Sequence, residues 1–458
     1  MTREDMTREG TSAAGATAAD ATDGAASNEG ASSTVASSTV ASSAVESSAA
    51  PSEDPARALR QLRSPRAVRE RCRAVLEHVL AGGSEHFRVD LGQLGSAVRH
   101  TRDAIALAYP DVKTIPFHSR VNHFRVGGRD RLGELEGHLG APRDRARALT
   151  DLVVTSVLLD AGAGPDWRFV EPGTGIEARR SEGLALASFH CFASGAFSSD
   201  PARPHQADAA GLARVTSQAL ATAFQVSPEN PLVGLEGRAA LLRELGRAIG
   251  RERACFAFAD RVGGLCDALA NRAEKGRLPA ELLLPHVLEA LGSIWPPRTQ
   301  RFGVELGDVW PHPAAGGDDE TRGLVPLHKL SQWLSYSLIY PLSAAGVEVV
   351  DVDALTGLAE YRNGGLFIDT AVIVPRDPAV LERSHAASSE LVIEWRALTV
   401  ALLDRLASEL RSELGLDARS LPLGKVLEGG TWAAGRKLAA ERRNGAPPFA
   451  IQSDGTLF

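Results

Sequence analysis

Apolar residues recur at helical spacing over most of the chain. They begin at Leu59, and the first clear run opens with Ser64-Pro65 and stops at Gly82-Gly83, which are typical start and stop signals of a helix. Similar patterns cover 143–160, 181–193, 207–224, 234–250, 279–292, 326–339, 388–414 and 431–443. Strand-like runs are fewer, the clearest being 123–126, 366–374, 449–451 and 456–458. Because strands do not alternate regularly with helices, the pattern predicts a predominantly α-helical fold with a small β-sheet.

The N-terminal segment lacks this periodicity. Of the first 50 residues, 35 are Ala, Ser, Thr or Gly, and none is Leu, Ile or aromatic. Such a segment cannot bury enough apolar area to offset the entropy of ordering it. We therefore expect 1–55 to be a disordered tail and 56–458 to be the folded region, with a division into two subdomains near 311–325.

Charge excludes some classes of partner. Residues 1–55 hold nine acidic and two basic residues, which is the whole chain's net charge of −7, so the remainder is balanced at 48 of each sign. Without a basic surplus, binding to nucleic acid or to an anionic membrane is not expected. No apolar run approaches the length of a membrane span, and no signal-peptide profile precedes the fold, so a cytoplasmic location is expected.

The sequence gives no sign of a metal or a cofactor. The four cysteines lie far apart, without the paired spacing of a zinc site or a disulfide framework. The segment 430–437, GTWAAGRK, has the glycine spacing of a P-loop, but Arg436 stands where the lysine is required. We expect no metal and no cofactor.

One helix carries a polar and aromatic stripe. Lys329, Gln332, Trp333 and Tyr336 fall at positions i, i+3, i+4 and i+7 of the run 326–339. One cation, one amide and two hydrogen-bonding aromatics are typical of a pocket wall. A half-buried amphipathic face is the alternative.

The segment TGLAEYRNGGLFID combines a turn signal with a carboxylate. Asn363, which opens Asn363-Gly364-Gly365, favours a turn whose amides bind an anion beside Tyr361 and Arg362, with a plain hairpin turn as the alternative. Asp369 lies inside a strand-like apolar run, where a carboxylate is costly to bury unless it is paired or functional. We consider Asp369 a catalytic candidate with Arg362 or Lys329 as its partner; a structural ion pair is the alternative.

Further candidates are scattered along the chain. Glu428-Gly429-Gly430-Thr431-Trp432 precedes a helix, so Thr431 as N-cap, the free amides and Arg436 would together seat a phosphate or carboxylate; a plain cap is the alternative. Glu394 and Arg396 flank a Trp and also fit a buried ion pair. His118, Arg120 and His123 gather before a strand-like run and could titrate or bind substrate. Asp160 and Glu182 stand at helix ends, where carboxylates act as caps or, in a site, as catalytic groups.

Several long motifs together resemble a known family. They are FHSRVNHF, DLVVTSVLLDAGAGPDW, RSEGLALASF, NPLVGLEGR, PLHKLSQWLSYSL, LTGLAEYRNGGLFID, SELVIEWRALTV, LEGGTWAAGR and SDGTLF. Over about 60–458 the chain is similar to the uracil catabolism protein 4 family, whose biochemical function is unknown. RSEGLALASF and NPLVGLEGRAALLRELG also resemble helical segments of queuosine-nucleotide salvage glycosidases.

The resemblance implies a pathway in which uracil becomes a ribotide and is degraded to urea and a three-carbon acid. One step of such a pathway is hydrolysis of the N-ribosidic bond of a ring-opened uracil ribotide. That step requires a carboxylate, for which Asp369, Asp160 and Glu182 are the candidates, together with an aromatic wall and a seat for the 5′-phosphate. The expected partner is thus a small phosphorylated pyrimidine-derived metabolite. A non-catalytic protein that binds the ribotide or another uracil-degradation enzyme is the alternative.

Overall fold

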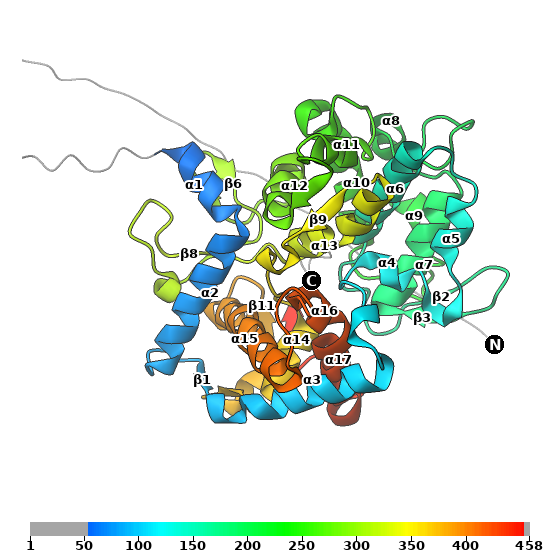
Figure 1. Ribbon diagram of the computed structural model, residues 1–458. Coiled ribbons are helices and arrows are strands. Elements are labelled where there is room, and N and C mark those ends of the chain that lie inside the picture. Colours follow the sequence, from blue (N-terminus) through cyan, green and yellow to red (C-terminus); the bar gives the residue numbers. More distant parts are fainter. Residues whose placement is uncertain (1–53, 453–458) are drawn as a thin grey trace, which may run out of the picture. The chain divides into compact units, whose positions relative to one another are not determined.

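The computed structural model describes residues 54–452, and helices dominate them (Figure 1). The expectation of a predominantly α-helical fold is confirmed. The helices are α1 (Pro55–Leu62), α2 (Pro65–Leu80), α3 (Leu94–Ala108), α4 (Arg120–His123), α5 (Arg131–Glu136), α6 (Pro142–Leu158), α7 (Arg180–Ala193), α8 (Ala209–Ala213), α9 (Ser217–Ala223), α10 (Leu235–Arg251), α11 (Gly264–Ala270), α12 (Leu283–Leu291), α13 (Lys329–Ala344), α14 (Tyr361–Asp369), α15 (Glu390–Leu414), α16 (Leu423–Val426) and α17 (Trp432–Arg443).

The β structure is divided into short pairs. Within residues 54–452 the strands form six two-stranded pairs, so the small β-sheet of the sequence analysis is not one sheet. Four pairs are antiparallel: β1 (Phe87–Val89) with β10 (Ile373–Pro375), β2 (Arg168–Val170) with β3 (Glu177–Arg179), β5 (Gln300–Arg301) with β6 (Val304–Glu305), and β7 (Val309–Pro311) with β8 (Leu324–Pro326). Two are parallel: β4 (Arg277–Pro279) with β9 (Glu348–Val350), and β11 (Ser384–Ala386) with β12 (Ala450–Gln452).

Most predicted helices are found close to their expected bounds. The Ser64 hydroxyl accepts a hydrogen bond from the Ala67 amide, so the expected cap and first-turn proline do begin α2. The stretch 207–224 is interrupted and forms α8 and α9. Residues 1–53, which hold nearly all of the expected tail, and the strand-like run 456–458 lie outside the described residues; α1 already begins at Pro55.

Two predicted strands are wrong. Residues 123–126 include the end of α4 and the start of a 3₁₀ turn, because the Ser119 hydroxyl caps a short helix by accepting from the Val121 amide. Residues 366–369 belong to α14, which the Glu360 carboxylate caps, and the only strand in 366–374 starts at Ile373. Asn363-Gly364-Gly365 is therefore helical and is not a turn.

Packing explains one glycine of α14 and one of α17. A Cβ added at Gly364 would lie 2.5 Å from the Trp395 indole, and one added at Gly435 would lie 2.2 Å from the Arg362 carbonyl oxygen. Glycine at these positions lets α14 approach α15 and α17 more closely than any other residue would. The glycines are thus determined by contacts that are distant in sequence.

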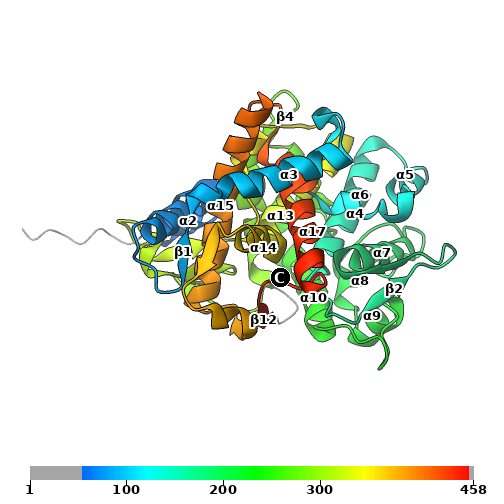
Figure 2. The same ribbon diagram turned by 90° about the horizontal axis from the view of Figure 1, so that it is seen from below.

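Helix α13 lies in the middle of the helices, beside α6 and α12 (Figures 1 and 2). Its buried side chains join a hydrophobic core that extends from Val68 to Phe449 and includes residues on both sides of 311–325. The division into subdomains near 311–325 stays a prediction.

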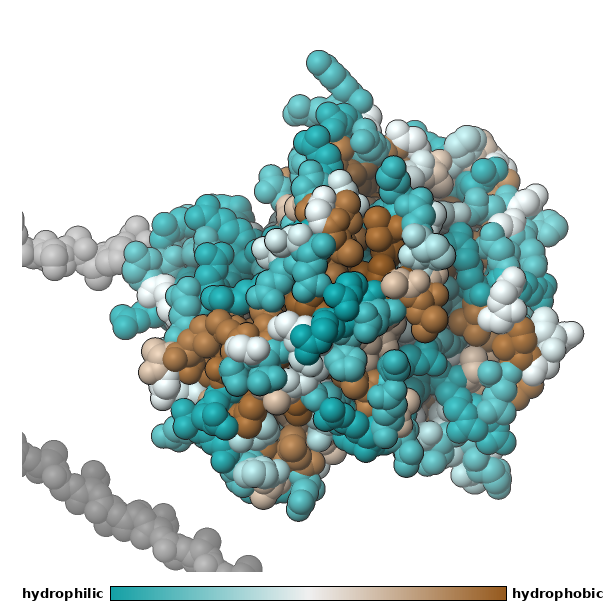
Figure 3. All heavy atoms as spheres, turned by 60° about the horizontal axis from the view of Figure 1, so that its bottom comes forward, coloured by the Kyte–Doolittle hydropathy of each residue, from teal (hydrophilic) through white to brown (hydrophobic). Residues whose placement is uncertain are grey.

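One face of the surface is mainly hydrophilic. On the face in Figure 3, hydrophilic residues surround separate hydrophobic patches. The large hydrophobic side chains exposed among residues 54–452 are Leu80, Leu107, Val170, Val233 and Phe258. None of the helices described here combines the length and the apolar composition that crossing a bilayer would take.

Candidate functional site

A cavity of about 460 Å³ opens where several helices begin. Its lining includes the first residue of α7 (Arg180), of α13 (Lys329) and of α17 (Trp432), the first two residues of α14, and the segment 446–451 near the C-terminus. Because helix N-termini carry partial positive charge, the start of α7 favours an anion in this cavity, whereas the starts of α13 and α14 already donate amide hydrogen bonds to the carboxylates of Asp308 and Glu360.

Two histidines lie between two tryptophans in the cavity wall. The rings of His118 and His123 have centroids 6.2 and 5.7 Å from the Trp333 indole and 6.1 and 6.0 Å from the Trp432 indole. Trp333 comes from α13, one turn after Lys329, and its indole N–H has no acceptor among the described residues. The wall thus offers flat aromatic surfaces together with polar atoms.

The two histidines have different environments. Burial, followed by the nearby charge of Arg120, holds the pKa of His123 well below its usual value, so this ring is neutral at pH 7. His118 instead lies 2.6 Å from the Glu428 carboxylate, measured from Nδ1 to Oε2. A carboxylate only accepts hydrogen bonds, so His118 Nδ1 carries the proton.

Asp160 presents a carboxylate to the cavity from the loop after α6. It is 6% exposed. The Arg120 guanidinium donates to its Oδ1 at 2.7 Å, and the Ser181 hydroxyl donates to its Oδ2 at 3.1 Å. Arg120 is fully buried, and it also donates to the Ser156 hydroxyl and the Ser181 carbonyl. The role of Arg120 is therefore to hold Asp160 and Ser181 in place; it does not line the cavity.

A second carboxylate in the cavity, that of Glu360, was missed by the sequence analysis. It caps α14 by accepting hydrogen bonds from the amides of Arg362 and Asn363, at 2.9 and 2.6 Å. Placing the helix start at Tyr361 would have identified Glu360 as an N-cap, but the Asn-Gly-Gly sequence favoured a turn. Arg180, Ser181 and the segment 446–451 were missed too, and nothing in the local sequence pattern indicates them.

Two of the cations that line the cavity are buried and have no ion pair. Among residues 54–452, no carboxylate lies within ion-pair distance of Lys329 or Arg362, which are 9% and 5% exposed. Burial lowers the pKa of Lys329, while attraction to Asp160 and Glu360 opposes that shift. The Arg362 guanidinium carbon lies 4.4 Å from the Trp432 ring centroid. Buried cations that no carboxylate contacts directly are stabilised when an anion joins them, so this pair is suited to binding one.

The expected anion seat at 428–436 has a different structure. Residues Leu427–Thr431 form a π-helical turn, η10, that joins α16 to α17 without a break. The amides there are not the free amides of a helix start, and Thr431 is a buried residue inside the turn that caps nothing. Arg436 donates to Glu182 at 2.5 Å, with 56% of its side chain exposed, and neither residue lines the cavity.

Other sequence candidates lie outside the cavity lining. Asp369 is paired with Arg443, and not with Arg362 or Lys329. Glu394 accepts from the Ser84 hydroxyl, and Arg396 donates to both oxygens of Asp308 at 2.7 Å. The Asp369–Arg443 pair corresponds to the structural alternative stated for that segment, whereas Arg396 is paired with Asp308 and not with Glu394.

The stripe on α13 divides between cavity and core. Lys329 and Trp333 line the cavity, whereas Tyr336 is fully buried and donates its hydroxyl to the Thr356 carbonyl. Gln332 and Asn363 are also fully buried, and Gln332 has no hydrogen-bond partner for its amide among the described residues. The cavity therefore joins eight of the sequence candidates: His118, His123, Asp160, Lys329, Trp333, Tyr361, Arg362 and Trp432.

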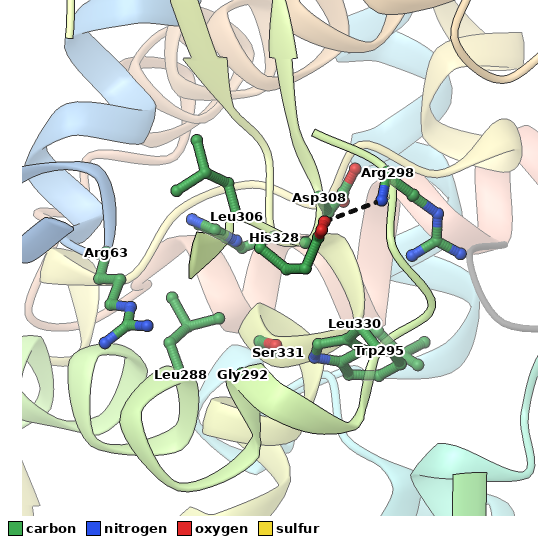
Figure 4. A pocket seen from close by; sticks show the side chains of 12 residues that line it. Arg63, Leu288, Gly292, Trp295, Arg298, Leu306, Asp308, His328, Leu330 and Ser331 are labelled. Atoms are coloured by element: carbon green, nitrogen blue, oxygen red, sulfur yellow. Dashed lines mark hydrogen bonds between the residues drawn. The ribbon is translucent and has the colours of Figure 1, made fainter. Parts of the chain in front are cut away.

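A smaller cavity of about 30 Å³ lies beside α12 and the start of α13 (Figure 4). Its lining includes Arg63, Asp308 and His328. His328 Nε2 donates to the Leu62 carbonyl at 2.9 Å, and burial lowers the pKa of His328 to about 4. A space of this size holds about one water molecule, so it is no substrate site.

One group of side chains could ligate a metal ion. Cys255, together with His286 and Glu289 from α12, offers ligand atoms within 4.8 Å of one another. None of the three lines the cavity of about 460 Å³. The four cysteines are free and buried.

Comparison with known proteins identifies relatives over nearly the whole chain. The model of the family described as "Protein of unknown function (DUF1688)" matches residues 61–458. "Protein urg3" of Schizosaccharomyces pombe is 38% identical over 411 residues, which cover 87% of this chain and 98% of that protein. "Uracil catabolism protein 4" of Lachancea kluyveri is 37% identical over 429 residues, covering 86% of this chain and 97% of the relative. Matches of this length and identity show that the chain belongs to the DUF1688 family, together with the uracil catabolism protein 4 of Lachancea kluyveri.

Proposed function

We propose that this protein acts in uracil catabolism and that its cavity binds a small phosphorylated pyrimidine-derived metabolite. The printed name of the Lachancea relative supports the pathway. A phosphorylated ligand is supported by Lys329 and Arg362, two buried cations without ion pairs. They line the same cavity as the Asp160 carboxylate. The composition and the buried free thiols fit a cytoplasmic protein.

The proposed reaction is hydrolysis of the N-ribosidic bond of a ring-opened uracil ribotide, with release of urea. Lys329 and Arg362 bind the 5′-phosphate, and the indoles of Trp333 and Trp432 pack against the ribose and the ureido group. As the bond to C1′ breaks, the ribose gains the positive charge of an oxocarbenium ion. Asp160 stabilises that charge and accepts a proton from the attacking water, while Arg120 and Ser181 fix its orientation.

A binding protein without catalysis is the second candidate. Both oxygens of Asp160 and both oxygens of Glu360 already accept hydrogen bonds inside the protein, as purely structural carboxylates would. In that case the protein would bind the ribotide, or bind a uracil-degradation enzyme and pass the ribotide to it.

Asp160→Asn separates the two candidates. The probe is synthetic N-ribosylurea 5-phosphate, with urea release as the measure of turnover and calorimetry as the measure of affinity. Catalysis requires turnover to fall by a factor of about 100 or more while affinity changes less than about threefold. A wild-type protein that binds the compound but releases no urea supports the binding protein.

Asp369→Asn is the matched comparison, because it removes a carboxylate charge outside the cavity lining. We expect it to lower turnover only in proportion to the folded fraction. A folded Asp369→Asn protein without turnover would transfer the catalytic role from Asp160 to Asp369.

A further inference from the structure

His118 and Glu428 form a carboxylate–imidazole pair at the cavity wall. The two atoms in contact are His118 Nδ1 and Glu428 Oε2, 2.6 Å apart, and the side chains are 5% and 13% exposed. His118 precedes α4 while Glu428 lies in the π-helical turn η10, so 310 residues of sequence separate them. A backbone hydrogen bond also holds the two segments together, since the His118 amide donates to the Gly424 carbonyl at 2.9 Å.

The remaining ring nitrogen of His118 is available to a ligand. Among residues 54–452, Nε2 has no hydrogen-bond partner. It is also not one of the completely buried polar atoms without a partner, so it remains accessible. Since His118 lines the cavity, Nε2 is the ring nitrogen that a ligand there can reach. His123 differs, because its Nδ1 lies 3.3 Å from an Arg120 nitrogen and the ring is held neutral by burial.

We infer that His118 is the general acid that protonates the leaving nitrogen and that Glu428 is its positioning residue. This inference rests on the proposed function. A ureido anion is a poor leaving group, so cleavage at C1′ requires a proton on that nitrogen as the bond breaks. A carboxylate that accepts Nδ1–H fixes the ring and stabilises the imidazolium form, whose second proton is on Nε2.

The proposed step balances. The C1′–N bond breaks, its electron pair stays on nitrogen, and Nε2 of His118 gives that nitrogen a proton. Water adds to C1′ and gives a proton to Asp160. Transfer of that proton to solvent and uptake of one by His118 restore the site, so the sum is consumption of one water molecule.

The test uses leaving groups that differ in their need for a proton. N-ribosylurea 5-phosphate needs one, whereas 4-nitrophenyl β-D-ribofuranoside 5-phosphate releases a stable phenolate without one. For His118→Gln we expect turnover of the ribosylurea to fall by a factor of about 100 or more, against less than about fivefold for the nitrophenyl compound. His123→Gln is the matched control and should affect both compounds equally.

Glu428→Gln is the second variant, because it keeps an acceptor at Nδ1 but removes the charge. It should show the same preference for the nitrophenyl compound with a smaller loss, about tenfold, on the ribosylurea. Equal losses on both compounds in folded His118→Gln and Glu428→Gln proteins would overturn the inference and leave the proposed function standing. A wild-type protein that hydrolyses neither compound would overturn the inference and the proposed hydrolysis together, and binding of the ribosylurea without urea release would support the binding protein.

Discussion

The Arg443 guanidinium donates to both carboxylate oxygens of Asp369, at 2.5 and 2.8 Å. The Asp369 side chain is 2% exposed and the Arg443 side chain 24%. The contact connects the last residue of α14 to the last residue of α17, so it joins two helices whose first residues line the cavity.

We expect Asp369→Asn to destabilise the fold. Removing one partner of a largely buried, bidentate ion pair leaves the other charge without compensation, and the free energy of unfolding should fall by about 2–4 kcal/mol. Urea denaturation monitored by circular dichroism measures this. Asp377→Asn is the control, because the Asp377–Arg383 pair is 59% and 57% exposed and should contribute about 1 kcal/mol or less. Equal effects of the two substitutions would contradict the prediction.

Arg362 should contribute more to anion binding than Arg436. Arg362 is buried at the cavity without an ion pair, whereas Arg436 is exposed and already paired with Glu182. We expect Arg362→Gln to weaken binding of ribose 5-phosphate by about 10- to 100-fold, corresponding to the about 1.5–3 kcal/mol of a charge-assisted hydrogen bond. Arg436→Ala should weaken it by less than about threefold. Calorimetry that ranks the two variants the other way would place the anion at Arg436.

Lowering the pH should destabilise the protein through His328. Its pKa in the fold is about 4, mainly because of burial, while an unfolded histidine has a pKa of about 6.5. Between these values the unfolded state binds the extra proton, so stability is complete above about pH 6.5 and is lost as the pH falls toward 4. His286, whose pKa burial also lowers to about 4, contributes with the same sign.

The check compares His328→Gln with the wild type. Glutamine retains a donor for the Leu62 carbonyl but does not titrate, so the variant should lose less stability than the wild type between pH 6.5 and 4.5. Melting temperatures at several pH values measure the two slopes. Parallel slopes would show that His328 does not contribute to the acid sensitivity.

Gly364→Ala should destabilise α14 although alanine is the better helix former. The added Cβ would lie 2.5 Å from the Trp395 indole and 2.8 Å from the Thr399 hydroxyl oxygen. We expect a cost of about 1–3 kcal/mol from overpacking. Gly250→Ala in α10 is the control, because no atom lies within 4 Å of its added Cβ, and it should stabilise by about 0.4–1 kcal/mol. Thermal denaturation of both variants distinguishes packing from helix propensity.

The sequence was sufficient to predict a helix and its bounds where local signals and packing agree. Ser64-Pro65 begins a helix as expected, and the long runs 388–414 and 431–443 match α15 and α17 closely. These helices have caps or apolar periodicity that can be recognised without knowing what surrounds them.

The sequence was insufficient where distant contacts determine a residue. Gly364 and Gly430 favour turns by local rules, but the indole of Trp395 and the methyl group of Thr101 occupy the space of their side chains. The pairing of Asp369 with Arg443 likewise spans 74 residues, so no local pattern indicates it.

For the site, the residue types were found but their geometry was not. The pairing of His118 with Glu428 and of Asp160 with Arg120 depends on how the helices pack. Glu360 was passed over because its helix was interpreted as a turn and a strand.

The π-helical turn at Leu427–Thr431 confines an extra residue to one short segment between α16 and α17. Such a turn accommodates one residue more than a regular α-helix would over the same rise. Loss of one residue there during evolution would restore α-helical geometry and leave Trp432 and Arg436, which follow the turn, in nearly the same orientation. The side chains that would move are those of the turn itself, among them Glu428, the partner of His118. Among homologues, a one-residue deletion between α16 and α17 is therefore a sign of an altered contact to His118 and not of a rearranged cavity wall.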